Sequence, residues 1–172
     1  RMGYALPSVT NNSPLVYSQT PGNNTYYWGF GPDNTGKLLL YYYAGSPVKI
    51  TGATTMYTNQ WYHCALYVDN SDNIKFYLNG VLDKSTTISG TVYTTGTDST
   101  EMHIGRGQNG EMGNFNIADV RVVRGEAVYT GAFTPPTGPL TKTGGTYSST
   151  TNVNTSITAS NTKLLLNFPA GI

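Results

Sequence analysis

The chain has 172 residues, of which 11% are charged, and its 10 Lys and Arg nearly balance 9 Asp and Glu to leave a net charge of +1. This length suits one ordinary domain, and the near-neutral charge gives no electrostatic footprint for binding nucleic acid or anionic lipid. The single cysteine excludes an intrachain disulfide and a cysteine-based zinc site, and no apolar run approaches the roughly 20 residues that span a bilayer, so we expect no membrane insertion.

Apolar and polar residues alternate with a period of two along most of the chain, which predicts β-strands. The segment Lys37–Tyr43 is apolar on both faces and predicts a strand inside a covered sheet, or one at an interface. Asn79 and Gly80 predict a type I′ hairpin turn. The predicted strands are, in chain order, residues 15–18, 26–30, 37–43, 48–51, 61–68, 74–78, 81–86, 102–104, 115–123 and 163–168.

Short strands at intervals of 8–12 residues are typical of an antiparallel β-sandwich or jelly roll. A parallel α/β fold needs helical crossovers, and the sequence offers no segment with a helical pattern for them. We therefore predict an all-β protein.

Three segments carry a family resemblance. The strand at 61–66, followed by the strand and turn at 74–80, resembles the central hairpin of laminin G-type domains in the concanavalin A-like group. Residues 102–105 are similar to the next strand of that family, and residues 117–136 are similar to its closing strand and exit. Such domains occur as repeats in phage fibres and bacterial surface proteins. The resemblance implies a laminin G-like jelly roll over residues 1–140, without its usual first strands.

Beyond three prolines, the chain continues as a Thr-, Ser- and Asn-rich stretch. We expect residues 141–172 to form a tail whose terminal strand begins a further repeat.

The resemblance implies a non-enzymatic binding or adhesion module of a virion fibre or surface appendage, located on the virion surface or outside the cell. The alternative is a purely structural spacer or decoration domain of such an assembly. An endoglycosidase is the third reading, and it lacks support because no predicted strand carries an alternating pair of carboxylates.

Aromatic and neutral polar residues supply the candidate ligand site. Sugars present apolar C–H faces and many hydroxyls, and this chain is rich in rings and amides and poor in charge. We therefore expect the partner to be a cell-surface glycan. The candidate ligand-binding residues are Trp28, Tyr41, Tyr43, Arg106, Gln108 and Asn109.

The remaining reactive side chains favour structural roles. His63, His103 and Cys64 lie in strand patterns, where a packed imidazole and an inert buried thiol are the ordinary outcomes. The Gly-rich stretch 105–110 lacks the helix that a dinucleotide site needs. The turn 69–73 has oxygens that could ligate calcium, but such turns also form for conformational reasons. We expect no catalytic residue, no metal site and no cofactor.

The apolar strands at 38–43 and 164–168 predict association with other chains. We expect a homo-oligomer in a fibrous or virion assembly, and fibres commonly have threefold symmetry, which makes a trimer the first expectation.

Overall fold

The computed structural model describes residues 2–4, 14–20, 23–88, 101–107, 112–113, 115–144 and 151–167. These residues form 13 β-strands and no helix, so none of them belongs to a helix that could span a membrane. The all-β prediction is confirmed. The strands are β1 (Met2–Tyr4), β2 (Val16–Thr20), β3 (Asn23–Pro32), β4 (Lys37–Tyr43), β5 (Pro47–Thr55), β6 (Gln60–Tyr62), β7 (Cys64–Val68), β8 (Asn73–Leu78), β9 (Val81–Thr87), β10 (Glu101–Ile104), β11 (Phe115–Ile117), β12 (Val120–Val123) and β13 (Thr162–Leu166).

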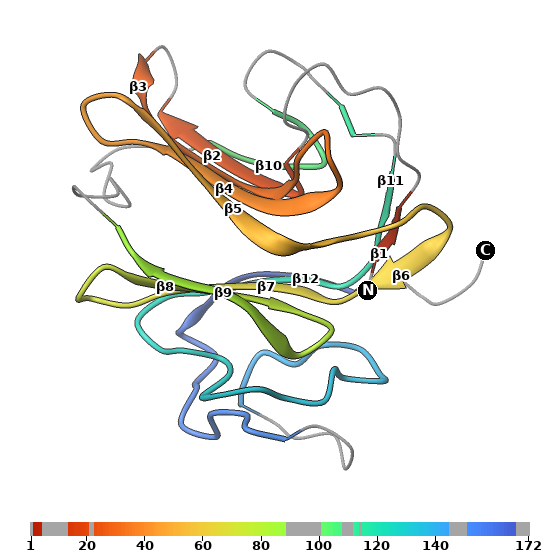
Figure 1. The fold of residues 1–172 in the computed structure, drawn as a ribbon. Coiled ribbons are helices and arrows are strands. Elements are labelled where there is room, and N and C mark those ends of the chain that lie inside the picture. Colours follow the sequence, from red (N-terminus) through yellow and green to blue (C-terminus); the bar gives the residue numbers. More distant parts are fainter. Residues whose placement is uncertain are drawn as a thin grey trace.

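Two antiparallel sheets face each other and make the sandwich (Figure 1). The larger sheet has five strands in the order β10-β2-β3-β4-β5, and the facing sheet has three in the order β7-β8-β9. At one side, β1 lies between β6 and β11 in a small third sheet, and β12 pairs with β13. This arrangement confirms the predicted antiparallel β-sandwich.

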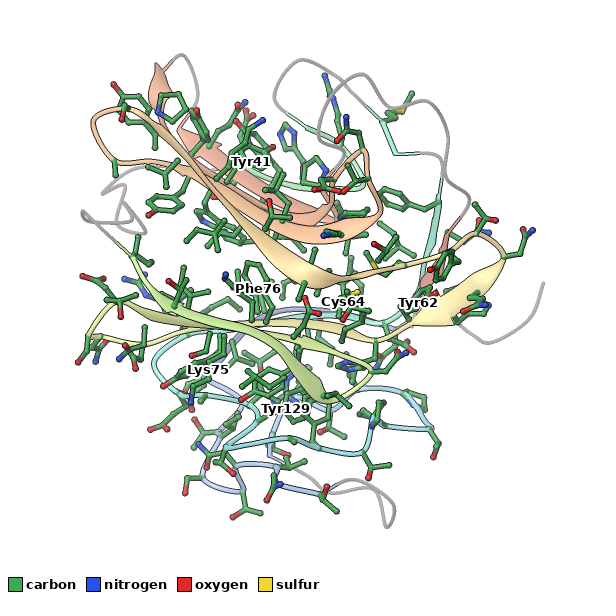
Figure 2. All side chains as sticks on the ribbon, in the orientation of Figure 1. Tyr41, Tyr62, Cys64, Lys75, Phe76 and Tyr129 are labelled. Carbon is green, nitrogen blue, oxygen red and sulfur yellow. The ribbon has the colours of Figure 1, made fainter. Side chains whose placement is uncertain are left out.

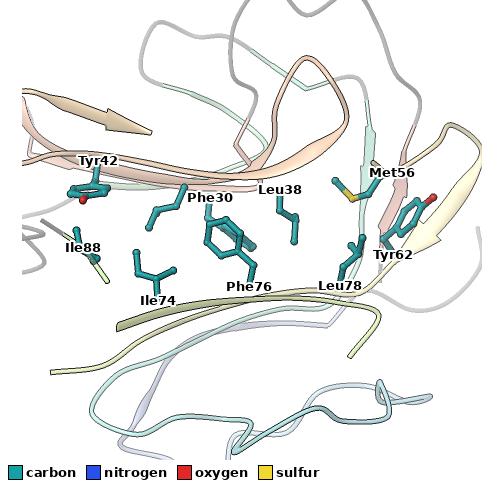
Figure 3. Close-up of a cluster of buried hydrophobic side chains, with 10 residues drawn as sticks. Phe30, Leu38, Tyr42, Met56, Tyr62, Ile74, Phe76, Leu78 and Ile88 are labelled. Atoms are coloured by element: carbon teal, nitrogen blue, oxygen red, sulfur yellow. The ribbon is translucent and has the colours of Figure 1, made fainter. Parts of the chain in front are cut away.

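The hydrophobic core lies between the two sheets (Figure 3). Phe30 of β3 meets Phe76 of β8 with ring centroids 5.7 Å apart, an ordinary separation for paired aromatic rings. Each fully buried aromatic or aliphatic side chain contributes about 1.5–3 kcal/mol to stability relative to an exposed one. The buried members of the cluster are Phe30, Leu38, Leu40, Tyr42, Met56, Tyr62, Ile74, Phe76, Leu78 and Ile88.

The strand β4 lies inside the five-stranded sheet, between β3 and β5, as one of the two alternatives for its apolar sequence predicts. Leu38, Leu40 and Tyr42 point into the core, since they belong to the buried cluster between the sheets. The alternation of the strand turns Tyr41 and Tyr43 to the opposite, outer face of the sheet.

The hairpin between β8 and β9 turns at Asn79 and Gly80, with φ of 52° and 81°. Positive φ at both central residues is the requirement of the predicted type I′ turn. The carbonyl of Gly80 also accepts a hydrogen bond from the N–H of Phe133, 2.9 Å away, and the Phe133 carbonyl occupies the place of a Cβ on Gly80. Glycine at this position therefore lets the segment around residue 133 lie directly on the hairpin.

Residues 124–144 and 151–161 run below the three-stranded sheet and cover it from the outside (Figure 1). The rings of Tyr129 and Phe133 stack with centroids 3.5 Å apart, and Phe133 also contacts Tyr77 of β8 at 5.6 Å. After this layer the chain returns to the sandwich, because β13 pairs with β12. The boundary expected at residue 140 stays a prediction, and these contacts cross it.

Candidate functional site

One row of residues crosses all five strands of the larger sheet on its outer face. Directly paired residues of neighbouring antiparallel strands project to the same face, so the register fixes the row. From one edge of the sheet to the other, the row consists of His103, Tyr17, Gly29, Tyr41 and Lys49.

Gly29 at the centre of the row makes room for a ring. The side chain of Tyr41 lies over the Gly29 backbone, where a Cβ atom would collide with its ring atoms. Tyr41 thereby reaches across β3 to Tyr17 of β2, and the two rings stack with centroids 5.9 Å apart at an interplanar angle of 23°. Because Gly29 has no side chain, aromatic rings from β2 and β4, which are not neighbouring strands, come into contact.

Two further tyrosines extend the cluster on the same face. Tyr27 of β3 lies 5.9 Å from Tyr41, 5.9 Å from Tyr43 and 6.3 Å from Tyr17, measured between ring centroids. We call the surface made by Tyr17, Tyr27, Tyr41 and Tyr43 the tyrosine face; Figure 2 shows Tyr41 on the outer side of the sheet. Tyr17 is buried beneath its neighbours, whereas the other three rings are partly exposed.

A chain of polar side chains borders the tyrosine face on β2 and β10. The hydroxyl of Tyr17 donates to Gln19 Oε1 at 3.2 Å, and Gln19 Nε2 donates to Glu101 Oε2 at 3.5 Å. The same carboxylate oxygen lies 3.2 Å from His103 Nε2, while His103 Nδ1 is buried without a hydrogen-bond partner among the described residues. This border offers an amide, a carboxylate and an imidazole to a polar ligand.

Burial raises the pKa of the Tyr17 hydroxyl, and the neighbouring Tyr27 adds to this effect. Burial, with Tyr43 nearby, also raises the pKa of Tyr27. Both phenols therefore remain neutral at physiological pH and can donate hydrogen bonds. The face as a whole combines apolar ring surface with uncharged donors.

The structure places only part of the predicted site on this surface. Tyr41 and Tyr43 lie on the tyrosine face, but Trp28 pairs with Tyr42 and packs against the core on the opposite side of the sheet. The reason is the period of two, which sends Trp28 inward because Tyr27 and Gly29 point outward. A binding site cannot use Trp28 together with the two tyrosines on one face.

The polar half of the predicted site follows β10. Arg106 is exposed and forms an antiparallel bridge with Met112. Gln108 and Asn109 lie outside the described residues.

Sequence reasoning omitted most of the residues that border the two predicted tyrosines. Tyr17, Gln19, Tyr27, Glu101 and His103 come from three different strands. Tyr27 carries a local signal, since it precedes Trp28 in the same aromatic strand. The others join the site only through the strand order β10-β2-β3, which no local pattern reveals.

His63 and Cys64 occupy packed positions on the three-stranded side of the sandwich. His63 contacts the rings of Phe133 and Tyr129 at 5.2 and 5.8 Å, and its Nε2 lies 3.4 Å from the Tyr129 hydroxyl. Burial lowers the pKa of His63 to about 4 and raises the pKa of the Cys64 thiol to about 12. Both groups are therefore neutral near pH 7, as expected for packed side chains.

The turn that could ligate calcium uses its carboxylate internally. Asp69 Oδ1 accepts hydrogen bonds from the N–H groups of Ser71 and Asn73, and Oδ2 accepts one from the Asn73 amide at 3.0 Å. Within the described ranges, no three His, Cys, Asp or Glu residues come together in a way that could hold a metal ion. Calcium binding by this chain stays a possibility raised by the sequence alone.

Comparison with known families gives a match over most of the chain. The sequence model of the concanavalin A-like lectin/glucanase superfamily, in its laminin G form, matches residues 4–128. The match includes both facing sheets and every residue of the tyrosine face. Comparison with curated proteins and with solved structures gave no match.

Proposed function

Because the chain belongs to the concanavalin A-like lectin/glucanase superfamily, we propose that it is a non-enzymatic module that binds carbohydrate on the tyrosine face. The observation that carries this proposal is the group of three partly exposed rings, Tyr27, Tyr41 and Tyr43, beside the side chains of Gln19 and Glu101. Sugar rings stack their C–H faces on aromatic side chains, and their hydroxyls bond to amides and carboxylates.

The distribution of carboxylates supports binding rather than hydrolysis. A glycosidase needs two carboxyl groups about 5–5.5 Å apart for retention, or roughly 6.5–9.5 Å apart for inversion. Among the described residues of the tyrosine face and its polar border, Glu101 is the single acid, and its close partner is His103 rather than a second acid. In the described part of the chain, the face thus has a polar border but no pair of carboxyl groups.

The proposal extends to the setting in which the module works. One site of this kind binds a sugar in the millimolar to high micromolar range, about −4 to −6 kcal/mol. Repetition in a homo-oligomer, such as a trimeric fibre on a virion or cell surface, raises the avidity by roughly 10²–10⁴ without new contacts. We propose such an assembly, and sedimentation at micromolar concentration tests it, with a stable monomer as the contrary result.

The test of the binding site is a pair of double variants on a glycan array, followed by NMR titration with a retained glycan. We expect Tyr41→Ala with Tyr43→Ala to weaken binding by at least about tenfold, because stacking surface is lost from the face. The matched control is Tyr57→Ala with Trp61→Ala, which removes two rings that are 64% and 45% exposed away from this face.

Thermal unfolding of each variant confirms that the fold survives. Two results would replace the proposed function with the spacer or decoration role. The first is that the unaltered chain retains no glycan on the array. The second is that the Tyr41/Tyr43 variant binds a retained glycan as tightly as the unaltered chain binds it.

A further inference from the structure

A cleft separates the free edges of the two facing sheets. β5 ends the five-stranded sheet and β9 ends the three-stranded one. The Asp83 carboxylate of β9 joins these edges at one point, accepting hydrogen bonds from the N–H groups of Ala53 at 3.0 Å and Thr54 at 2.8 Å. Elsewhere between the two strands a cleft of about 280 Å³ remains, lined by Tyr42, Val48, Lys49, Ile50, Thr51, Lys84, Thr86 and Thr87.

The lining is cationic and rich in hydroxyls. It contains two lysines and three threonines and no carboxylate, in a chain whose net charge is only +1. The nearest acid of β9, Asp83, already accepts two backbone hydrogen bonds. The lining therefore carries two positive charges, while the negative charge of Asp72 acts on the Tyr42 hydroxyl from outside the lining.

A buried hydroxyl in the cleft wall lacks a partner. Tyr42 is fully buried, and among the described residues its Oη has no hydrogen-bond acceptor or donor. Burial, and next the charge of Asp72, raise the pKa of this hydroxyl, so it stays a neutral donor. Buried polar groups are nearly always hydrogen-bonded, so this hydroxyl is an exception at the base of the cleft.

We propose that this cleft is a second subsite that binds a sugar unit carrying an anionic group, with Lys49 and Lys84 as its charge partners. Its volume is at the small end of ligand pockets, about 300 Å³ and above, which suits a single ring rather than a large ligand. Val48 and Ile50 supply apolar wall for the ring, and the threonines supply hydroxyls for its polar edge.

The cleft borders the tyrosine face. Lys49 pairs directly with Tyr41, so it is both the end of the outer row and part of the cleft lining. A glycan lying across the tyrosines can therefore place an acidic unit over the β5 edge. The inference rests on one part of the proposed function, namely that the module binds sugars.

The experiment is an NMR titration of the full chain at low salt with glucuronic acid, glucose 6-sulfate and glucose. We expect the acidic sugars to shift the amide signals of residues 48–51 and 84–87 at concentrations where glucose does not. Lys49→Gln with Lys84→Gln should weaken this binding by at least about fivefold, because two charge-assisted contacts are lost. Added salt should weaken it as well.

The matched control is Lys142→Gln with Lys163→Gln, which removes the same charge from two exposed lysines outside the cleft and should leave the titration unchanged. Comparing the carboxylate with the sulfate identifies which anion the cleft prefers. Equal shifts with glucose, no shifts at these amides, or unchanged binding by the Lys49/Lys84 variant would overturn the inference.

The Tyr41/Tyr43 variant separates the two proposals. If it loses neutral glycans while the cleft signals never respond to acidic sugars, the proposed function stands and the cleft inference is wrong. If the amide signals of the cleft shift with acidic sugars and no glycan loses binding in the Tyr41/Tyr43 variant, the cleft inference stands and binding on the tyrosine face is wrong.

Discussion

The ring of Tyr41 lies on the backbone of Gly29, across the strand that separates it from Tyr17. A Cβ on Gly29 would occupy the same space as the Tyr41 ring, so the position of the ring depends on the absence of a side chain. The stacking of Tyr41 on Tyr17, at the centre of the candidate binding face, therefore depends on glycine at position 29.

Gly29→Ala is expected to displace Tyr41 from the row and to lower stability by about 1–3 kcal/mol, the usual cost of overpacking. Carbohydrate binding should fall with it, because the stacked geometry of Tyr41 and Tyr17 is lost. Denaturant unfolding and glycan binding measure the two effects. Gly131→Ala is the control, since its added Cβ meets no atom closer than 3.6 Å. Equal stability of the two variants would contradict the steric account of Gly29.

Acidification is expected to destabilise the fold through His63. Burial lowers its folded-state pKa to about 4 from 6.5, so the unfolded chain binds the proton more readily. The stability that comes from burying a neutral His63 is fully present above pH 6.5. As the pH falls toward 4, the free energy of unfolding decreases by about 2–3 kcal/mol. Urea unfolding between pH 4 and 7 should show it.

His63→Gln should remove that part of the pH dependence, while His103→Gln should retain it. The difference between the two variants isolates His63 from the carboxylates that titrate in the same range. A His63→Gln profile parallel to that of the unaltered chain would show that burial of this imidazole carries no proton linkage.

Asp83→Asn is expected to loosen the junction between β5 and β9. Asp83 accepts from two backbone N–H groups through its two oxygens, and asparagine retains only one of those acceptors. We expect a loss of about 1.5–3 kcal/mol, the usual effect of a missing hydrogen bond to a charged group. Hydrogen exchange should accelerate at Ala53 and Thr54.

Glu126→Gln provides the control for Asp83→Asn, because this exposed carboxylate bonds to the Asn154 side chain away from β5. Unaltered exchange at Ala53 and Thr54 in the Asp83 variant would mean that the two edges are held together by packing alone.

Local patterns predicted much of the fold. The alternation along β8 and the Asn79–Gly80 pair determine a hairpin whose partners are adjacent in sequence, so both strand and turn are readable from it. The apolar run of β4 likewise indicates an inner strand, because no exposed strand needs leucines on both faces.

The candidate site was readable only in part, for a physical reason. In β3 nearly every position near Trp28 is aromatic or glycine, so the sequence does not reveal which half of the alternation faces the core. Tyr17 and His103 reach Tyr41 through the pairing of strands far apart in the chain. The cleft depends on two sheet edges whose approach is decided by tertiary packing.

The pairing of β12 with β13 bears on the order in which the chain acquires its structure. The two strands are separated by about 40 residues, and a loop of that length adds an entropic cost to their meeting. During synthesis β12 emerges before β13. Until β13 follows, the N–H and C=O groups of β12 that pair with it have no strand partner. Only in the first part of this interval, before residues 129–133 follow, does the outer surface of β8, including Tyr77, lack the rings of Tyr129 and Phe133. The chain is thus most prone to misassociation after the two facing sheets have formed and before β13 has paired with β12.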